Sequence, residues 1–265
     1  MAPVTPGDVV AITGASGFIG SHVCDAALAA GYRVRAVVRD PSDTEKVKHL
    51  LDLNGAQERL TLHRGLLDVA GSYDDAFEGA AAVIHTAAVV EIMSVKDPIA
   101  QIVKPSVDGV QNVLASAEKA STVRRFVHTS SEIAVLDWER PPDTTFSESD
   151  WNTSSKVDSG GDYYGYAKVT AERTVQDYKS AHFDAVRILP GINLGPCMTK
   201  AHTKASAVVV RQMLYGNAQP EYQGHFVDVR DTAIAHVRAL SWTVPTDDCR
   251  RFICCIDDGM KVSEL

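Results

Sequence analysis

The chain has 265 residues, of which 45% are hydrophobic and 23% charged, which suits one large α/β domain or a domain with a small lobe. A net charge of −8 disfavours a nucleic-acid partner, and no apolar run reaches the roughly 18–20 residues that span a bilayer. Five cysteines and nine histidines are scattered without a metal-ligand or disulfide spacing. With no cleavable leader in the first residues, these features favour a cytoplasmic protein without a metal site.

A glycine-rich turn follows the first apolar run. The residues from Val9 to Thr13 are typical of a strand, Gly14, Gly17 and Gly20 follow at a spacing of three, and a helical pattern opens at Phe18. This layout places free backbone N–H groups and the positive end of a helix dipole against an anion. The first glycine permits the tight turn, the second lets a diphosphate approach, and the third lets the helix pack on the strand. The stretch predicts a dinucleotide-binding turn.

Strand and helix signals alternate along the first half of the chain. The predicted strands are 8–13, 32–38, 59–63, 81–86 and 123–129, and the helices between them lie near 18–30, 42–53, 72–78 and 98–120. Such alternation indicates a parallel sheet covered on both faces, and right-handed crossovers then give a doubly wound, Rossmann-type α/β fold.

The tip of the second predicted strand bears on the choice of cofactor. Folds that bind NAD carry an acid there for the ribose 2′-hydroxyl, whereas a basic residue accommodates the 2′-phosphate of NADP. Here Val38 is followed by Arg39, and Lys46 lies in the next helix. A guanidinium pairs strongly with a phosphate, so the sequence favours NADPH over NADH. In the alternative that stays open, Asp40 binds a ribose hydroxyl and Arg39 is merely solvated.

Residues 137–161 interrupt the alternation with prolines, serines and acids, which predicts a long surface excursion, functional or disordered. Later elements are expected at about 162–180 (helix), 184–189 (strand), 203–216 (helix), 229–242 (helix) and in the strand-like run RFICCI that starts at Arg251. We place the dinucleotide domain at 1–190 and a smaller, partly interleaved substrate lobe at 191–265.

Tyr164 and Lys168 lie four residues apart in a predicted helix, so their side chains share one face. A lysine ammonium near a phenol lowers the pKa of that phenol, which can then exchange a proton with a substrate oxygen near neutral pH. In isolation the pair is more often an exposed aromatic and a solvated lysine. However, the fifth strand ends at Thr129-Ser130-Ser131, and ligands lie at the carboxyl ends of strands in this fold. A serine there could stabilise negative charge on a carbonyl oxygen.

These stretches resemble the extended short-chain dehydrogenases/reductases, in which TGxxGFIG, a serine after the central strand and Tyr-xxx-Lys occur in this order. The resemblance covers nearly the whole chain. It is strongest to the branch of dihydroflavonol reductase, cinnamoyl-CoA reductase and fungal or yeast aldehyde and ketone reductases, through stretches such as FEGAAAVIHTAA, VRRFVHTSS, YYGYAKVTAE and ILPGINLGP.

The resemblance implies residue roles. Ser131 orients the substrate carbonyl (Ser130 if the register is off by one), Tyr164 is the acid, and Lys168 lowers its pKa and holds the nicotinamide ribose. The implied cofactor contacts come from the glycine turn, the second strand tip, later strand ends and the catalytic helix: Gly14, Ser16, Gly17, Phe18, Ile19, Gly20, Arg39, Lys46, Leu66, Thr86, Ala87, Ala88, Ser130, Tyr164, Lys168 and Pro190.

The chain departs from the family pattern in three places. Many members carry an Asp-Leu pair after the third strand, with the acid on the adenine amine, whereas Arg64-Gly65-Leu66 lacks that acid. The cinnamoyl-CoA reductase motif NWYCYGK reads GDYYGYAK here, which argues against that substrate. Members usually continue beyond the point where this chain ends at Leu265, so we expect an incomplete substrate lobe.

The sequence thus predicts an NADPH-dependent reductase of a ketone or aldehyde, monomeric or homodimeric, with a small-molecule carbonyl substrate. Its pocket walls are expected at 89–96, 132–137, 192–200 and 203–222. Two alternatives stay open. One is a sugar-nucleotide epimerase or dehydratase with tightly held NAD, which Arg39 disfavours. The other is a non-catalytic dinucleotide sensor, which the Tyr164–Lys168 pair disfavours.

Overall fold

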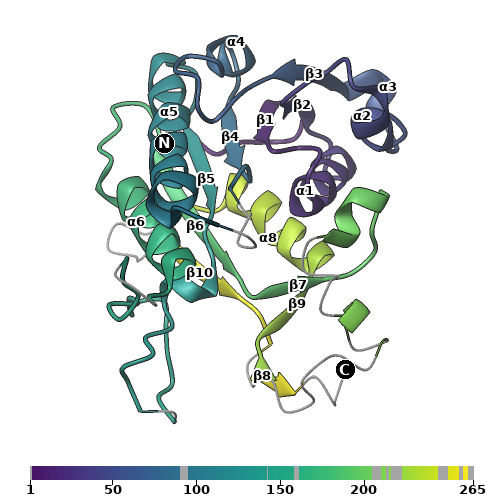
Figure 1. Cartoon of the computed structure of the whole chain (residues 1–265). Helices are drawn as coiled ribbons and strands as arrows, with labels where there is room; N and C mark the ends of the chain where they lie inside the picture. Colours follow the sequence, from purple (N-terminus) through teal and green to yellow (C-terminus); the bar gives the residue numbers. More distant parts are fainter. Residues whose placement is uncertain are drawn as a thin grey trace.

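A parallel seven-stranded sheet with the strand order β10-β6-β5-β4-β1-β2-β3 forms the centre of the molecule (Figure 1). The computed structural model describes residues 2–89, 95–141, 143–157, 161–204, 210–212, 215, 223–243, 250–256 and 259–261. Within these residues the expected doubly wound α/β fold is confirmed.

Each strand of this sheet begins and ends within two residues of the bounds expected from the sequence. They are β1 (Val9–Thr13), β2 (Arg33–Val38), β3 (Leu60–Arg64), β4 (Ala82–His85), β5 (Arg125–Thr129), β6 (Asp184–Pro190) and β10 (Arg251–Cys254). The last of these is the RFICCI run. It pairs with β6, so a strand from beyond residue 190 completes one edge of the central sheet.

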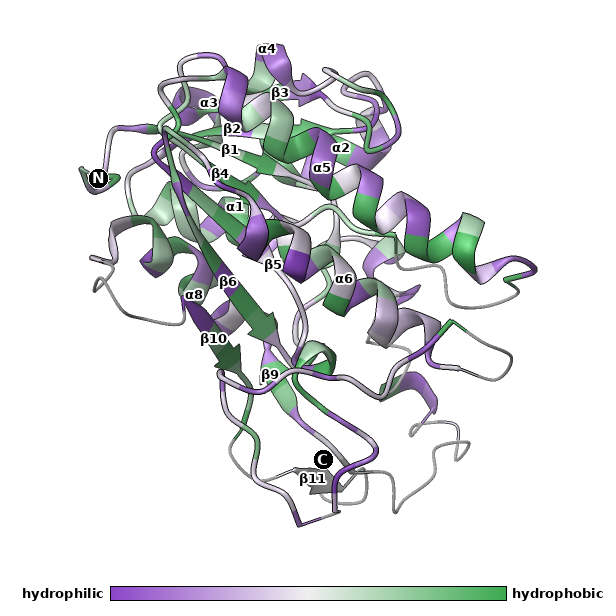
Figure 2. Ribbon diagram, turned by 90° about the vertical axis from the view of Figure 1, so that its left-hand side faces the viewer, coloured by the Kyte–Doolittle hydropathy of each residue, from purple (hydrophilic) through white to green (hydrophobic). Residues whose placement is uncertain are grey.

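Helices cover both faces of the sheet. Two apolar clusters form, because alternate strand residues point to opposite faces: Val10 and Ile12 belong to one cluster and Ala11 to the other. The first cluster includes residues of α1 (Phe18–Ala29), α2 (Thr44–Leu51) and α8 (Val229–Ser241). The second includes residues of α4 (Asp74–Phe77), α5 (Lys104–Lys119) and α6 (Tyr163–Asp177). Figure 2 shows the hydrophobic strands enclosed between helices whose outward surfaces are more hydrophilic.

Several short elements were not expected from the sequence. They are α3 (Ala56–Arg59), the 3₁₀ turns η2 (Glu132–Ala134) and η3 (Lys200–Lys204), and two small sheets, β7 (Ile192–Leu194) with β9 (Phe226–Asp228) and β8 (Gln223–Gly224) with β11 (Met260–Lys261). The helix expected near 203–216 lies largely outside the described residues, as do parts of the expected pocket walls 89–96 and 203–222.

The helix predicted at 98–120 divides into a π turn, η1 (Ile99–Val103), and α5. Pro105 stands at the start of α5 and has no N–H group to donate, so the regular α-helical bonding is interrupted at this junction. None of the described helices is long and apolar enough to span a bilayer.

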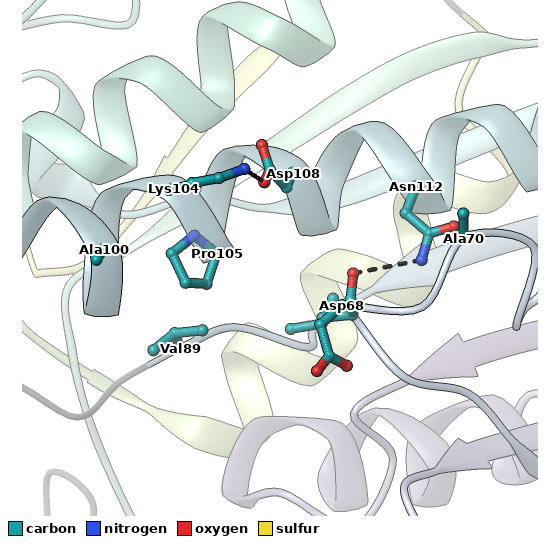
Figure 3. A pocket seen from close by; sticks show the side chains of 9 residues that line it. Asp68, Ala70, Val89, Ala100, Lys104, Pro105, Asp108 and Asn112 are labelled. Atoms are coloured by element: carbon teal, nitrogen blue, oxygen red, sulfur yellow. Dashed lines mark hydrogen bonds and ion pairs between the residues drawn. The ribbon is translucent and has the colours of Figure 1, made fainter.

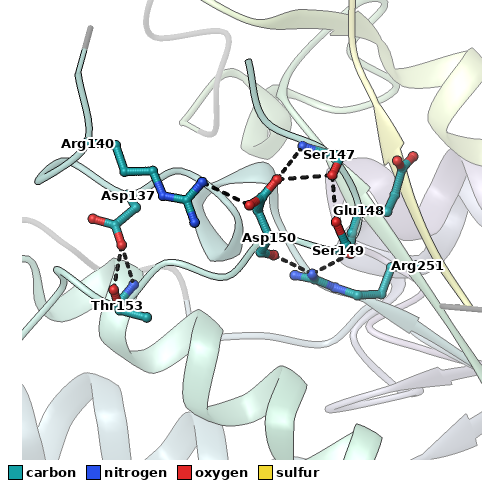
Figure 4. Close-up of polar contacts among 8 residues, drawn as sticks. All are labelled: Asp137, Arg140, Ser147, Glu148, Ser149, Asp150, Thr153 and Arg251. Atoms are coloured by element: carbon teal, nitrogen blue, oxygen red, sulfur yellow. Dashed lines mark hydrogen bonds and ion pairs between the residues drawn. The ribbon is translucent and has the colours of Figure 1, made fainter. Parts of the chain in front are cut away.

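The excursion at 137–161 is an ordered loop over its described residues (Figure 4). Asp137 accepts hydrogen bonds from the Thr153 hydroxyl at 2.5 Å and from the Thr153 and Glu139 amides, which lower the pKa of this carboxyl to about 2. Asp150 accepts from Arg140 at 2.9 Å, while Arg251 of β10 donates to the Asp150 carbonyl at 2.6 Å. The loop is thereby attached to the edge of the central sheet.

Candidate active site

The glycine turn brings the ends of β1 and β4 together. Gly14 has φ +65°, and a Cβ there would lie 2.7 Å from Cα of Ala87, so only glycine fits. A Cβ on Gly20 would lie 2.2 Å from the Gly14 carbonyl oxygen, so α1 crosses the turn in close contact. Two further bonds join the strands: Thr86 Oγ1 donates to the Thr13 carbonyl at 2.7 Å, and the Ala87 amide donates to Thr13 Oγ1 at 3.3 Å.

The amino end of α1 fits a phosphate group. Three other helices have a carboxylate cap. Asp43, Asp162 and Asp228 accept backbone N–H groups at the starts of α2, α6 and α8. The helix α1 instead begins after Gly17, which is exposed, and among the described residues no side chain accepts its first N–H groups. Those donors and the helix dipole are therefore available to an anion.

A histidine from the C-terminal part of the chain covers the same turn. His202 of η3 places Nε2 3.1 Å from the Ser16 carbonyl oxygen, and its ring centroid lies 5.7 Å from that of Phe18. The Phe18 side chain is buried and that of Ile19 is half-buried. We therefore expect these two residues to contact a cofactor through their backbone N–H groups rather than through their side chains.

The basic residues at the tip of β2 differ in availability. Arg39 is exposed and makes no polar contact within the described residues, whereas Lys46 forms an ion pair with Asp43 at 2.5 Å. The carboxylate of Asp40 accepts the hydroxyl and amide of Ser42, at 2.6 and 2.9 Å, and these bonds lower the pKa of Asp40. Asp40 is thus occupied by its own turn, which favours Arg39 as the ligand-binding residue.

The segment after β3 borders a cavity of about 510 Å³ (Figure 3). A Cβ on Gly65 would lie 2.5 Å from the Tyr73 ring and 2.6 Å from Val37, so packing accounts for a glycine at the position where the family pattern led us to expect an acid. The expected cofactor residues Leu66 and Ala88 are followed directly by Leu67 and Val89, which line the cavity with residues of α5.

Tyr164 and Lys168 share one face of α6, as expected. Lys168 Nζ lies 5.7 Å from the centroid of the Tyr164 ring, and both side chains are half-buried. The start of this helix is fixed by Asp162, which accepts the Gly165 amide at 2.9 Å and the Ser155 hydroxyl at 2.8 Å. A carboxylate cap and a close loop therefore set where the tyrosine lies.

The two serines after β5 have different surroundings. The Ser130 hydroxyl is buried and donates to Glu172 at 2.6 Å. Ser131 caps η2 by accepting the Ile133 amide at 3.4 Å, and its own proton has no acceptor within the described residues. Ser131 therefore keeps a donor for a carbonyl oxygen, which favours it over Ser130 as the substrate-orienting serine.

Two histidines beneath these residues were missed from the sequence. His85 and His128 are register partners on β4 and β5, with ring centroids 5.5 Å apart. Burial lowers the pKa of His85 to about 3 and that of His128 well below its usual value, and the positive charge of Lys168 adds to both effects. The signal that could have revealed them is a histidine near the end of two adjacent predicted strands. The last expected residue, Pro190, is buried at the end of β6.

A model of the "NAD dependent epimerase/dehydratase family" matches residues 10–251. The chain belongs to this family. It is 36% identical over 241 residues to dihydroflavonol 4-reductase of Arabidopsis thaliana, covering 88% of this chain and 62% of that protein. It is 35% identical to cinnamoyl-CoA reductase CAD2 of Medicago truncatula, covering 88% of this chain and 72% of the relative.

Solved structures agree with these relatives. Gre2 of Candida albicans, crystallised in complex with NADPH, superposes with a TM-score of 0.84 at 25% identity, covering 97% of this chain and 80% of that one. These similarities place this epimerase/dehydratase-family chain in the extended short-chain dehydrogenase/reductase group, in the dihydroflavonol reductase-like branch. The chain spans about three fifths of the length of the Arabidopsis relative.

Proposed function

We propose that this chain reduces a ketone or an aldehyde to an alcohol with NADPH, using Tyr164 as the proton donor. Three observations carry the proposal. Lys168 Nζ lies 5.7 Å from the Tyr164 ring on α6, the Ser131 hydroxyl after β5 keeps a proton to donate, and the start of α1 after β1 has no side-chain cap within the described residues. The carboxyl ends of β1 and β5 lie on one edge of the parallel sheet, where ligands of this fold bind. The relatives support it, because those reported above are named reductases and one is complexed with NADPH.

The residues of this chain would divide the reaction as follows. When bound, NADPH supplies a hydride to the carbonyl carbon. Ser131 donates a hydrogen bond to the carbonyl oxygen and stabilises its developing negative charge, and Tyr164 transfers its phenolic proton to that oxygen to complete the alcohol. The ammonium of Lys168 favours the phenolate that Tyr164 becomes.

The same residues would hold the dinucleotide. The N–H groups at the start of α1 would bind the diphosphate, and the Thr86–Ala88 turn would contribute further contacts to the dinucleotide. Arg39 binds the 2′-phosphate, with Lys46 adding positive charge once it leaves Asp43. The proposal differs from an NAD-dependent epimerase in this use of Arg39, which makes no polar contact within the described residues, whereas Oδ1 of Asp40 already accepts two bonds from Ser42.

The test compares two tyrosines of one helix. Wild-type protein should oxidise NADPH in the presence of reducible carbonyl compounds, and Tyr164→Phe should lower kcat by about 10²–10⁴-fold. Tyr166→Phe is the matched control, because Tyr166 is followed four residues later by Thr170 rather than a lysine. Near-normal turnover by Tyr164→Phe would overturn the proton-donor assignment. NADPH binding without turnover of any carbonyl compound would instead support a sensor.

A further inference from the structure

A second cavity, of about 620 Å³, lies between the end of α6 and the outer edge of β6. The strand β10 pairs with β6 only from Arg187 to Pro190, so the first three residues of β6 have no strand beside them on that side in the described part of the chain. The cavity borders this uncovered edge, through Asp184, Ala185 and Arg187. The candidate active site lies beyond the other end of β6, so the two are separate. The volume is in the range of small-molecule sites.

Aromatic rings from three segments line this cavity: Trp151 from the loop at 137–161, Tyr178 from the end of α6, and Phe183 from the residue before β6. Trp151 is held between two guanidinium groups, with Cζ of Arg251 3.8 Å and Cζ of Arg173 4.5 Å from its ring centroid. The rings of Tyr178 and Phe183 are parallel to within 5°, with centroids 6.0 Å apart. Rings held in this way offer apolar surfaces to a planar ligand.

The charged residues that line the cavity leave a surplus of positive charge. Lys179, Arg187 and Arg250 line it. Within the described residues, neither the ammonium of Lys179 nor the guanidinium of Arg250 has an acidic partner. The carboxylate of Asp184, which also lines the cavity, is already paired with Nε of Arg125 at 2.5 Å. The cavity therefore suits an anionic ligand.

The backbone at Arg250 is unusual. Its φ is +51°, in the left-handed region that glycine adopts without the steric cost of a side chain. The Arg250 carbonyl accepts the Arg187 amide at 2.9 Å, which opens the pairing of β10 with β6. Glycine would satisfy this backbone position, so the long cationic side chain is not there for the turn itself. A strained residue on the wall of a cavity points to a role for its side chain.

We propose that this cavity binds a small aromatic carboxylate. The ring would lie against the aromatic walls formed by Trp151, Tyr178 and Phe183. The carboxylate would accept two parallel hydrogen bonds from the planar guanidinium of Arg250 and a further one from Lys179. The inference does not depend on the proposed reduction, because it concerns binding at a place apart from the candidate active site.

The experiment is a calorimetric titration of the full chain with naphthalene-2-carboxylate, with and without saturating NADPH. Naphthalene-2-carboxamide lacks the charge, and cyclohexanecarboxylate lacks the aromatic ring. The naphthoate should bind at least about tenfold more tightly than either, because each of them loses one kind of contact. NADPH should leave its affinity unchanged. Equal affinities for the three compounds, or displacement by NADPH, would overturn the proposal.

Two variants locate the bound carboxylate. Arg250→Gly removes the guanidinium and relieves the backbone, so it should raise the Kd of the naphthoate about tenfold or more without lowering the melting temperature. Lys179→Gln, at an exposed position, should also weaken binding. Arg238→Gln is the matched control, because this exposed arginine belongs to α8 on the other face of the sheet, and its Kd should match wild type.

A purely structural Arg250 gives the opposite pattern. Arg250→Gly would then melt at a lower temperature and bind the naphthoate as wild type does, which would overturn the assignment. Unchanged affinity in both Arg250→Gly and Lys179→Gln would place the ligand elsewhere on the protein. NADPH oxidation with carbonyl compounds is measured separately, so failure of this binding site and failure of the proposed function are told apart.

Discussion

The hydroxyl of Ser130 donates a 2.6 Å hydrogen bond to Oε2 of Glu172, which lies one helical turn beyond Lys168 on α6. Glu172 is fully buried, and its other carboxylate oxygen accepts Nε of Arg251 at 2.6 Å. Through this carboxylate, the helix α6, the end of β5 and the edge strand β10 are joined at one point. Ser130 therefore belongs to the support of the site, and its neighbour Ser131 faces the substrate in the proposed function.

Substitution of the two serines should give opposite effects. Ser131→Ala should lower kcat/KM for a carbonyl substrate by about 10²–10³-fold, because it removes a donor to the oxyanion, with little change in stability. Ser130→Ala should instead lower the free energy of unfolding by about 1–3 kcal/mol, because it leaves a buried carboxylate oxygen with one donor fewer. Steady-state kinetics and urea unfolding of both variants test this, and the reverse pattern would reassign the serines.

Substitution of two glycines of the turn should distinguish a residue needed for cofactor binding from one needed for helix packing. A Cβ on Gly17 meets only the Gly14 carbonyl at 3.1 Å, so Gly17→Ala should fold nearly normally, yet its methyl group occupies the approach to the α1 N–H groups. We expect NADPH to bind at least about tenfold more weakly. Gly20→Ala forces the 2.2 Å contact and should unfold at markedly lower temperature. Calorimetric titration and thermal melts of the two variants provide the comparison, and equal melting temperatures would contradict it.

The exposed guanidinium of Arg39 should set the preference between the two nicotinamide cofactors. Arg39→Ala should raise KM for NADPH about tenfold or more and leave KM for NADH nearly unchanged, because only NADPH carries the 2′-phosphate. Arg33→Ala, at the exposed opposite end of the same strand, is the control. A parallel change in both KM values would show that Arg39 acts on the strand rather than on the phosphate.

Buried histidines should make the fold sensitive to acid. Burial lowers the pKa of His85 to about 3 and that of His236 to about 4, whereas an unfolded histidine titrates near 6.5. Between these values the unfolded chain binds protons that the native chain does not. The free energy of unfolding should therefore fall as the pH drops below about 6.5, by about 1.4 kcal/mol per pH unit for each histidine.

Glu132 acts in the opposite direction over part of this range, because its pKa is raised to about 8, and it offsets one histidine. Urea unfolding at about pH 6.5 and about pH 5, where both named histidines act over the whole interval, measures the net slope. His236→Gln keeps a donor near the Thr232 carbonyl and should flatten that slope. An unchanged slope in this variant would mean that His236 does not contribute.

The sequence predicted the sheet well because its buried parallel strands are continuous apolar runs, as in Val9–Thr13. Local motifs also pointed to Tyr164, Lys168 and Ser131, whose roles stay predictions. It missed Glu172, His85 and His128, because the setting of each depends on a partner far away in the chain. It likewise missed β7 and β9, which are three-residue strands without a periodic signal. The proposed boundary at residue 190 stays a prediction.

The pairing of β10 with β6 affects how the chain folds while it is being synthesised. The strand β6 is complete at Pro190, but its partner Arg251–Cys254 leaves the ribosome much later. Throughout that interval the nascent chain presents a long apolar strand with an unpaired edge, a feature that invites association with other chains. The two arginines that meet Glu172, Arg187 and Arg251, also arrive at different times. We expect this edge of the sheet and the helix α6 to pack together only once β10 has been translated, rather than in the order of the sequence.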